Sequence, residues 1–242
     1  MNSHRNFAIC GYAFAILAVL SVCLSSAYAG LDEAKAAYIR KDYVTAAKEF
    51  RPLAEKGDVR AQTTLGWMYS EGLGVGKDYK EAMKWLLKAA ALDGNPDAAK
   101  AQHDLGVMYE NGLGVPVDTT RSAYWYRKGA QNGDPSAQCN LGTLYLEGKG
   151  VERNYPQAVR WLTKAAEQGD TEAYANLGKV YFEGLGVQQN WALSYFFLYM
   201  AANYGDRKSP QAKQGLNLLL PKISPEQLAS GKRMVNEALL KQ

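Results

Sequence analysis

One pattern of apolar and small residues occurs four times along the chain, beginning at Ala61, Ala101, Ala137 and Ala173. In each copy, apolar residues stand at offsets 0, 4, 7 and 8 from this alanine, as Ala61, Leu65, Met68 and Tyr69 do in the first. This spacing places them on one face of an α-helix. A second segment with helical spacing follows in each copy, so we predict two helices per repeat.

The second segment contains small residues and, in three copies, a tryptophan: Trp85, Trp125 and Trp161. We expect the small residues to let the paired helices approach, and the tryptophan to fill the gap between them. A glycine at offset 5 costs its helix about 1 kcal/mol relative to alanine. Its return in every copy predicts a close contact that leaves no room for a side chain. These glycines are Gly66, Gly106, Gly142 and Gly178.

The segment between the two helices contains GLGVGK in the first repeat, which superficially resembles a phosphate-binding loop. Such a loop requires the spacing G-x-x-x-x-G-K-S/T, but Gly72 and Gly76 are four residues apart and Asp78 follows Lys77. A turn explains the residues better. The first glycine caps the first helix, the next allows the chain to reverse, and an Asp or Asn caps the second helix. The predicted N-caps are Asp78, Asp118, Asn154 and Asn190.

The flanking segments complete a linear organisation. Residues 42–58 match the second half of the repeat, and residues 31–40 supply a partner helix. Near the C-terminus, Ser224, Pro225 and Gln227 begin an amphipathic run with the signature of a capping box. We therefore predict the following division: an N-terminal helix pair at 30–60, repeats at 61–100, 101–136, 137–172 and 173–206, and C-terminal capping helices at 207–242.

Residues 1–29 have the layout of a secretory signal: Arg5, then the apolar run 7–24, then small residues before a cleavage site predicted after Ala29. The alternative is an uncleaved membrane anchor, since the run is about as long as a short spanning helix. Cleavage would leave Cys139 as the only thiol, so no disulfide could form within the chain. The net charge of +4 is too small to favour nucleic acid or an anionic membrane surface as partner.

The repeated pattern, A-x-x-x-L-G-x-x-Y-x-x-G-x-G-V-x-x-D/N followed by A-x-x-W-x-x-x-A-A, resembles the Sel-1-like repeat family, relatives of the tetratricopeptide repeats. The resemblance covers residues 42–206. It implies an all-α, right-handed solenoid of antiparallel helix pairs that binds other proteins, often in bacterial envelopes. A cysteine-rich branch of the family, with suggested penicillin binding and β-lactamase activity, carries a cysteine pair in each repeat. This chain lacks those pairs, and its fourth repeat has Phe197 and Ser194 where Trp and Ala belong.

Catalytic candidates are few beyond residue 29. His103 is the only histidine there and occupies an offset held elsewhere by Thr63, Cys139 and Ala175, which favours an ordinary exposed helix position. Cys139 could serve as a nucleophile or thiol sensor, although a packed small residue explains it better. No S-x-x-K, G-x-S-x-G or H-E-x-x-H motif follows Ala29. We therefore expect no enzymatic activity, no cofactor and no metal.

Offsets 2, 3, 6, 9 and 10 remain for a strip along the concave face of stacked repeats. Its amides and carboxylates could bond the backbone of an extended peptide, with two aromatic residues as apolar anchors; a solvated helix face explains the same residues equally well. The strip comprises Thr64, Trp67, Glu71, His103, Asp104, Glu110, Asn140, Thr143, Glu147, Asn176, Lys179 and Phe182.

The sequence thus predicts a periplasmic or secreted scaffold, adaptor or regulator of the cell envelope that binds a protein or peptide on this strip, without inserting into the membrane once the signal is cleaved. Two alternatives stay open: an enzyme acting on cell-wall or β-lactam substrates, and a mechanical spacer.

Overall fold

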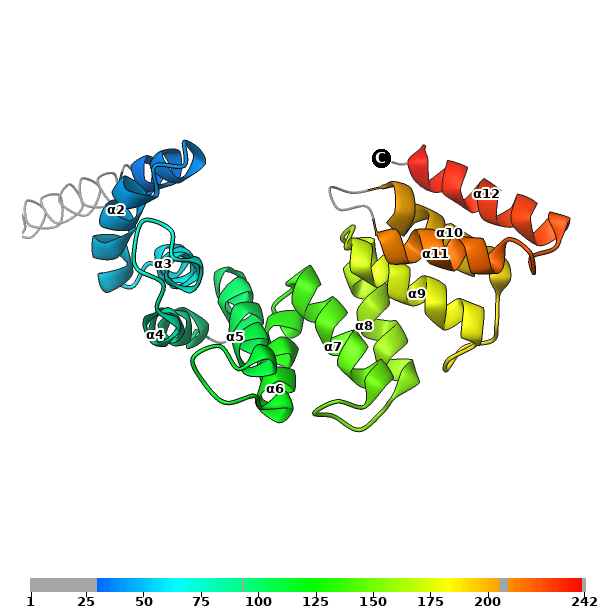
Figure 1. Ribbon diagram of the computed structural model, residues 1–242, viewed down its shortest axis with the longest axis horizontal. Helices are drawn as coiled ribbons and strands as arrows, with labels where there is room; N and C mark the ends of the chain where they lie inside the picture. Colours follow the sequence, from blue (N-terminus) through cyan, green and yellow to red (C-terminus); the bar gives the residue numbers. More distant parts are fainter. Residues whose placement is uncertain (1–29, 93, 205–208, 241–242) are drawn as a thin grey trace, which may run out of the picture. The chain divides into compact units, whose positions relative to one another are not determined.

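The computed structural model describes residues 30–92, 94–204 and 209–240, and the regular elements within them are all helices (Figure 1). The predicted signal at residues 1–29 lies outside this part of the chain. No helix among the described residues combines the length and apolar character needed to cross a membrane. The helices form two compact units, one ending at Ala91 and the other beginning at Leu92. The all-α prediction is therefore confirmed.

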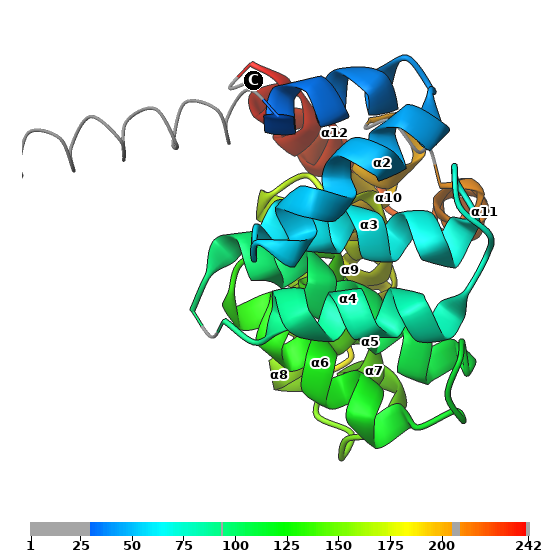
Figure 2. The ribbon, with the colours of Figure 1, turned by 90° about the vertical axis from the view of Figure 1, so that its left-hand side faces the viewer.

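The first unit contains helical residues 30–39 followed by α2 (Tyr43–Glu55), α3 (Val59–Glu71) and α4 (Tyr79–Ala90). Helices α3 and α4 lie side by side and antiparallel, joined by the GLGVGK segment (Figure 2). Phe50, Leu65 and Trp85 are buried in the core that these helices share.

The second unit stacks three helix pairs and ends in two further helices (Figure 1). Helices α5 and α6, α7 and α8, and α9 and α10 form the pairs, while α11 and α12 pack on α10. The first helices of successive repeats also contact each other directly: α5 contacts α7, and α7 contacts α9; α9 in turn contacts α11. The elements are η1 (Pro96–Ala98), α5 (Ala99–Asn111), α6 (Thr119–Gln131), α7 (Pro135–Glu147), α8 (Tyr155–Glu167), α9 (Thr171–Glu183), α10 (Trp191–Asn203), α11 (Pro210–Leu219) and α12 (Pro225–Leu239).

Helix termini follow the predicted local chemistry. The first helix of each repeat ends at a left-handed glycine, and the second begins at an Asp or Asn whose side chain accepts a backbone N–H of the first turn. Ser224 and Gln227 form the predicted capping box of α12. The turn glycine has a second role, because a Cβ on Gly150 would overlap the carbonyl of Thr119 at the start of α6. The loop therefore packs tightly on the preceding pair.

The offset-5 glycine makes the predicted close contact. A Cβ on Gly142 would lie 2.7 Å from Cγ of Leu162, and one on Gly178 would lie 2.6 Å from Cγ of Leu198. The residue that fills the gap is thus the one after the tryptophan position. Trp161 is only half-buried, whereas its neighbour Leu162 is fully buried. The prediction that tryptophan fills the gap is wrong for Trp161, because adjacent helical positions point about 100° apart, whereas Trp85 is buried in the core of the first unit.

Buried glutamines connect successive pairs, a feature that the sequence analysis missed. Gln62 donates from Nε2 to the carbonyl of Ala54 at 2.9 Å, and Gln138 donates in the same way to Ala130 at 3.1 Å. Each bond joins the first helix of a repeat to the end of the preceding second helix. Because a buried amide is costly without partners, these bonds favour one register between pairs. The fourth repeat has Tyr174 at this position.

Candidate functional site

A row of polar side chains crosses α5, α7 and α9 in the second unit; we call it the polar row. Asn140 Nδ2 lies 3.3 Å from His103 Nε2, and Asn176 Nδ2 donates to Thr143 Oγ1 at 3.1 Å. Each of these contacts bridges neighbouring repeats. The row therefore contains five residues of the predicted strip, namely Asp104, His103, Asn140, Thr143 and Asn176, which the structure does bring together.

His103 is less exposed than the sequence suggested, with 12% of its side chain accessible. Its Nδ1 lies 3.0 Å from Oδ1 of Asp104, and the same oxygen accepts from Lys100 Nζ at 2.6 Å. The neutral tautomer with hydrogen on Nδ1 satisfies both contacts, since it donates to Asp104 and accepts from Asn140. Within the described residues, Asp104 Oδ2 is buried without a hydrogen-bond partner. Because its two ring nitrogens contact Asp104 and Asn140, His103 orients both of these side chains.

Glu110 is held by a tyrosine of the paired helix. The hydroxyl of Tyr126 donates to Glu110 Oε2 at 2.6 Å, and the Tyr126 ring is fully buried. Burial of the phenol raises the pKa of Tyr126 well above its ordinary value, and the Glu110 carboxylate raises this pKa further. Glu110 therefore stabilises the α5–α6 pair, and a partner could reach only its remaining oxygen.

Cys139 is buried on α7, and desolvation raises the pKa of its thiol, with a further increase from Asp170 and Glu172. The thiol is 3.9 Å from Nδ2 of Asn176. A thiol held in its protonated form is a poor nucleophile. The interpretation of Cys139 as a packed small residue agrees with its burial.

Three strip residues belong to the first unit. Thr64 donates to the carbonyl of Arg60 at 2.8 Å within its own helix, and Glu71 is exposed. Trp67 is half-buried and packs edge-on against Tyr38, with 6.0 Å between ring centroids. It is part of the packing of residues 30–39 on α3, so its substitution would also affect stability.

Glu147, at the end of α7, is paired with Lys149 at 2.7 Å between carboxylate and ammonium. Both side chains are largely exposed. Such an exposed pair contributes little to stability because water screens it, and a charged partner could displace it. Glu147 is therefore available on the surface, and it takes part in neither bonded pair of the polar row, Asn140–His103 or Asn176–Thr143.

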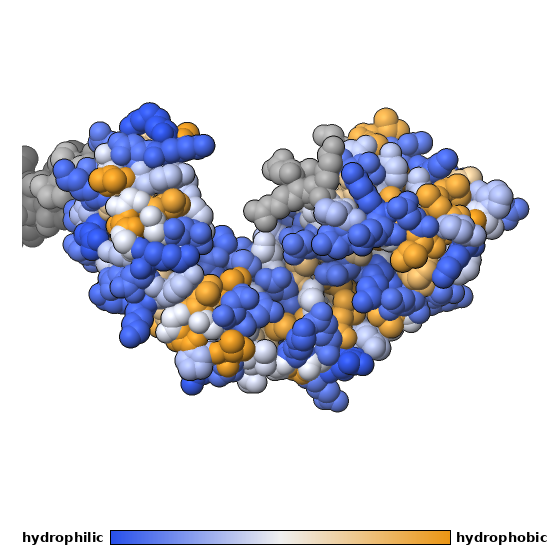
Figure 3. Space-filling view, viewed as in Figure 1, coloured by the Kyte–Doolittle hydropathy of each residue, from blue (hydrophilic) through white to orange (hydrophobic). Residues whose placement is uncertain are grey.

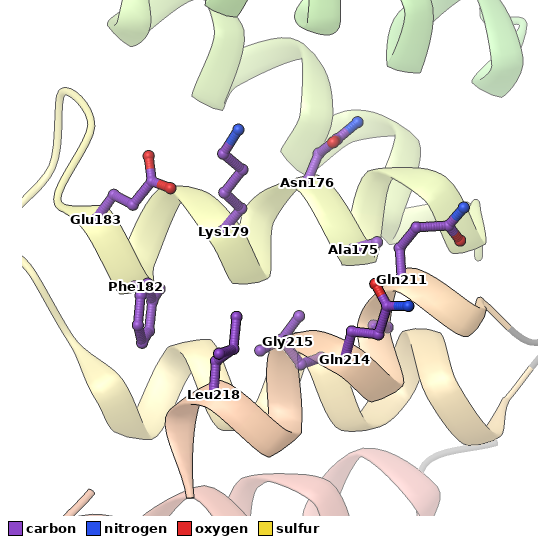
Figure 4. A pocket seen from close by; sticks show the side chains of 11 residues that line it. Ala175, Asn176, Lys179, Phe182, Glu183, Gln211, Gln214, Gly215 and Leu218 are labelled. Carbon is purple, nitrogen blue, oxygen red and sulfur yellow. The ribbon is translucent and has the colours of Figure 1, made fainter. Parts of the chain in front are cut away.

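The last strip residues meet a pocket of about 340 Å³ between α9 and α11; we call it the α9–α11 pocket (Figure 4). Asn176, Lys179 and Phe182 stand on its α9 side, and Phe182 points toward α11. Leu198 of α10 also lines it. The α11 side consists of Gln211, Ala212, Gln214, Gly215 and Leu218. The sequence analysis missed this wall, because α11 lies beyond the last repeat and the repeat pattern cannot place it.

The GLGVGK segment has the contacts of a turn. The Leu73 N–H donates to Met68 and the Asp78 N–H donates to Tyr69, so these backbone donors are already used. Lys77 Nζ lies 5.0 Å from the ring centroid of Tyr79, whose hydroxyl raises the pKa of this lysine. Among the described residues, no group of three or more His, Cys, Asp or Glu could hold a metal ion.

Comparisons with solved structures agree on the fold. A Sel1 repeat protein from Oxalobacter formigenes is 32% identical, with a TM-score of 0.68, over 85% of this chain and 84% of its own. The protective antigen c5321 of uropathogenic Escherichia coli, described as having an SLR fold, is 31% identical with a TM-score of 0.67. That alignment covers 92% of this chain and 56% of c5321.

A more distant structure, the immunity protein Pa5087 from Pseudomonas aeruginosa, is 20% identical with a TM-score of 0.52, over 88% of this chain and 81% of its own. At that identity the likeness concerns the fold alone. No curated protein matches the chain significantly.

The Sel1 repeat model matches the sequence at residues 59–94, 99–134, 135–170 and 171–206. These matches begin at the starts of α3, α5, α7 and α9, and together they cover more than half of the chain. The chain belongs to the Sel1 repeat family.

Proposed function

We propose that this protein is a non-catalytic adaptor or regulator of the bacterial cell envelope that binds a protein partner on the second unit, along the polar row and into the α9–α11 pocket. One observation carries the proposal: two hydrogen-bonded pairs of polar side chains, one between α5 and α7 and one between α7 and α9, lie in a row that ends at an open pocket with an apolar floor. Pockets that recognise ligands commonly combine an apolar lining with a few placed polar groups.

The amides of the polar row suit an extended peptide. The amide nitrogen of Asn176 donates to Thr143 and Cys139, and the Asn140 side chain is bonded to His103 and Tyr126. The described residues give no hydrogen bond to either Oδ1 atom. Each amide could therefore accept a hydrogen bond at Oδ1 from a backbone N–H of a peptide. Their orientation is fixed in advance by His103 and Thr143, which lowers the entropy lost on binding.

The surroundings of His103 support a role without catalysis. Within the part of the chain that the structure describes, the side chains within hydrogen-bond distance of its ring are Lys100, Asp104 and Asn140. None of them is a hydroxyl or thiol that the imidazole could activate as a nucleophile. Export rests on the layout of residues 1–29 alone, and the envelope location is part of the proposal.

Partner capture tests the binding function. The tagged chain, purified from cells expressing the full sequence, would be cross-linked in a bacterial envelope fraction, and captured proteins would be identified by mass spectrometry. We expect Asn140→Ala to reduce capture of a specific partner at least several-fold with an unchanged circular dichroism spectrum. Asn236→Ala, an exposed amide on α12, is the matched control. Equal capture by wild type and Asn140→Ala would remove the polar row from the proposal.

A second assay tests the absence of catalysis. We expect no hydrolysis of a chromogenic β-lactam or of purified peptidoglycan. Turnover that is lost in His103→Ala but kept in Asn236→Ala would instead make the protein an enzyme. Localisation is tested separately by fractionating cells that express the full chain; retention in the cytoplasm would contradict the envelope assignment.

A further inference from the structure

The α9–α11 pocket is lined by a small residue at a position where the second repeat carries a larger one. Ala175 lines the pocket, and its counterparts in the two preceding repeats are His103 and Cys139. Gly215 brings α11 close to the floor, since a Cβ there would lie 2.8 Å from Cδ2 of Leu198. The pocket therefore depends on these particular residues and is not a general consequence of the repeat.

The pocket has an apolar end that lies open at the surface. Phe182 and Leu218 face each other across it from α9 and α11, and 65% of Leu218 is exposed (Figure 4). Hydrophobic surface is visible over the α11 region in Figure 3. An exposed apolar wall beside a hollow can be covered favourably by an apolar group of a ligand, because apolar surface is then removed from water.

The opposite end is polar but uncharged. Gln211 and Gln214 extend from α11 near Ala175, whereas the Asn176 side chain points from α9 away from α11 (Figure 4). The described residues give no hydrogen bond to the Gln214 side chain, so both its donor and its acceptor are available. Neighbouring amides that flank an apolar floor match the alternating donors and acceptors of an extended peptide backbone.

The charges near the pocket favour an acidic ligand. The segment 209–223, which includes α11, contains Lys213 and Lys222 and no Asp or Glu. Lys222 Nζ lies 5.0 Å from the ring centroid of Phe182, and Lys179 stands on the α9 rim. Neither lysine has an ion pair among the described residues. Glu183 is the single acid that lines the pocket, so the balance around the apolar end is positive.

We propose that the α9–α11 pocket receives one large apolar side chain of an extended acidic peptide, whose neighbouring carboxylate lies beside Lys222 and Lys179 and whose backbone bonds Gln214 and Gln211. The volume of about 340 Å³ is near the lower end for ligand pockets and suits one such side chain with its adjoining backbone. This inference rests on the proposed protein-binding function and specifies the partner's chemistry.

A random nonapeptide library displayed on phage provides the test. The chain purified from cells expressing the full sequence would be the bait, and Ala175→Leu, which fills the pocket, would be used for counter-selection. We expect enriched peptides to carry a net negative charge and one large apolar residue at a constant position. Enrichment of basic peptides, of peptides without an apolar anchor, or of no peptides at all would overturn the proposal.

Affinities of a selected peptide then separate the contributions. We expect Ala175→Leu to weaken binding about tenfold or more. The double variant Lys179→Gln/Lys222→Gln should weaken it about threefold to tenfold, and this difference should shrink at high salt. Matched controls on the exposed surface of α12 are Ala229→Leu and Lys232→Gln. Thermal unfolding would establish that every variant is folded.

The outcomes distinguish the pocket from the broader function. A peptide that binds Ala175→Leu as tightly as wild type but loses affinity for Asn140→Ala would overturn the pocket proposal and leave protein binding along the polar row intact. Sedimentation that reveals a dimer of the wild type, dissociated by Ala175→Leu, would assign the pocket to a second copy of this chain and would likewise overturn the proposal.

Discussion

The α5–α6 and α9–α10 pairs share one backbone plan and use it differently. In the first, His103 lies beside the Tyr126 ring, with 5.7 Å between ring centroids, and the Tyr126 hydroxyl is bonded to Glu110. In the second, the equivalent positions hold Ala175 and Leu198, and both line a pocket. Equivalent positions of the helix pair therefore hold a polar cluster in one repeat and line a pocket in another.

This difference separates scaffold from function within the repeat. Both pairs keep the offset-5 glycine, Gly106 or Gly178, against the filler residue of the second helix. Tyr126 and Leu198 are these filler residues, whereas His103 and Ala175 are not among the atoms nearest to the glycine. A repeat protein can thus vary its surface at a few positions while nearest-neighbour packing is conserved.

The largest expected effect comes from breaking the shared scaffold. Gly106→Val and Gly178→Val should each destabilise the second unit by about 3 kcal/mol, because a Cβ would overlap Tyr126 or come within 2.6 Å of Leu198, and valine is confined in its rotamers. Urea denaturation followed by circular dichroism measures this loss.

Gly76→Val is the control, since a Cβ at Gly76 would meet no atom within 4 Å and its backbone is not left-handed. We expect this variant to change the free energy of unfolding by less than about 0.5 kcal/mol. Near-wild-type stability of either buried variant would mean that the paired helices can separate without cost, which contradicts the close packing described above.

A smaller effect concerns the polar cluster that distinguishes the α5–α6 pair from the α9–α10 pair. Tyr126→Phe removes the hydroxyl bonded to Glu110 and should cost about 2 kcal/mol, as expected for a buried hydrogen bond to a carboxylate. Tyr145→Phe, which loses a longer 3.3 Å bond from Arg127, should cost less than about 1 kcal/mol. Equal losses in the two variants would show that burial adds nothing to the Tyr126–Glu110 bond.

The same tyrosine gives the α5–α6 pair a dependence on pH. Burial and Glu110 raise the pKa of Tyr126 in the folded chain above its ordinary value of 10.0. The resulting stability is present below about pH 10 and declines as pH rises further, because the unfolded chain ionises first. Between pH 10 and 11.5, wild-type stability should therefore fall more steeply than that of Tyr126→Phe. Parallel curves would contradict this linkage.

Local rules were sufficient to predict the repeated helix pairs and their ends from the sequence. Gly148, Asn154 and Ser224 occupy the predicted caps because capping depends on a few neighbouring residues. The same periodicity put Asn140 and Asn176 on one face, and the structure bonds each to the neighbouring repeat. Their role in binding stays a prediction.

Packing choices between equally apolar neighbours could not be predicted in this way. Trp161 and Leu162 both suit a core, and only the approach of Gly142 determines that the leucine fills the gap. Similarly, Gln138 reads as a surface residue until the end of the preceding helix covers it. The α11 side of the pocket, with Gln214 and Leu218, could not be predicted from the sequence, because its position depends on tertiary contacts outside the repeat pattern.

The smallest expected effect comes from removing the histidine of the α5–α6 pair. His103→Ala gives the second repeat the residue that the fourth carries at Ala175, and it removes the contacts with Asp104 and Asn140. We expect a loss of about 1 kcal/mol in the free energy of unfolding, because Asp104 keeps its bond from Lys100 and water can reach the vacated space. Thr63→Ala, the equivalent change in the first repeat, should cost less, since that hydroxyl bonds only its own helix. The side-chain amide resonance of Asn140 should shift in His103→Ala and stay unchanged in Thr63→Ala. An unshifted resonance in both variants would mean that the histidine does not orient Asn140, and the polar row would then begin at α7.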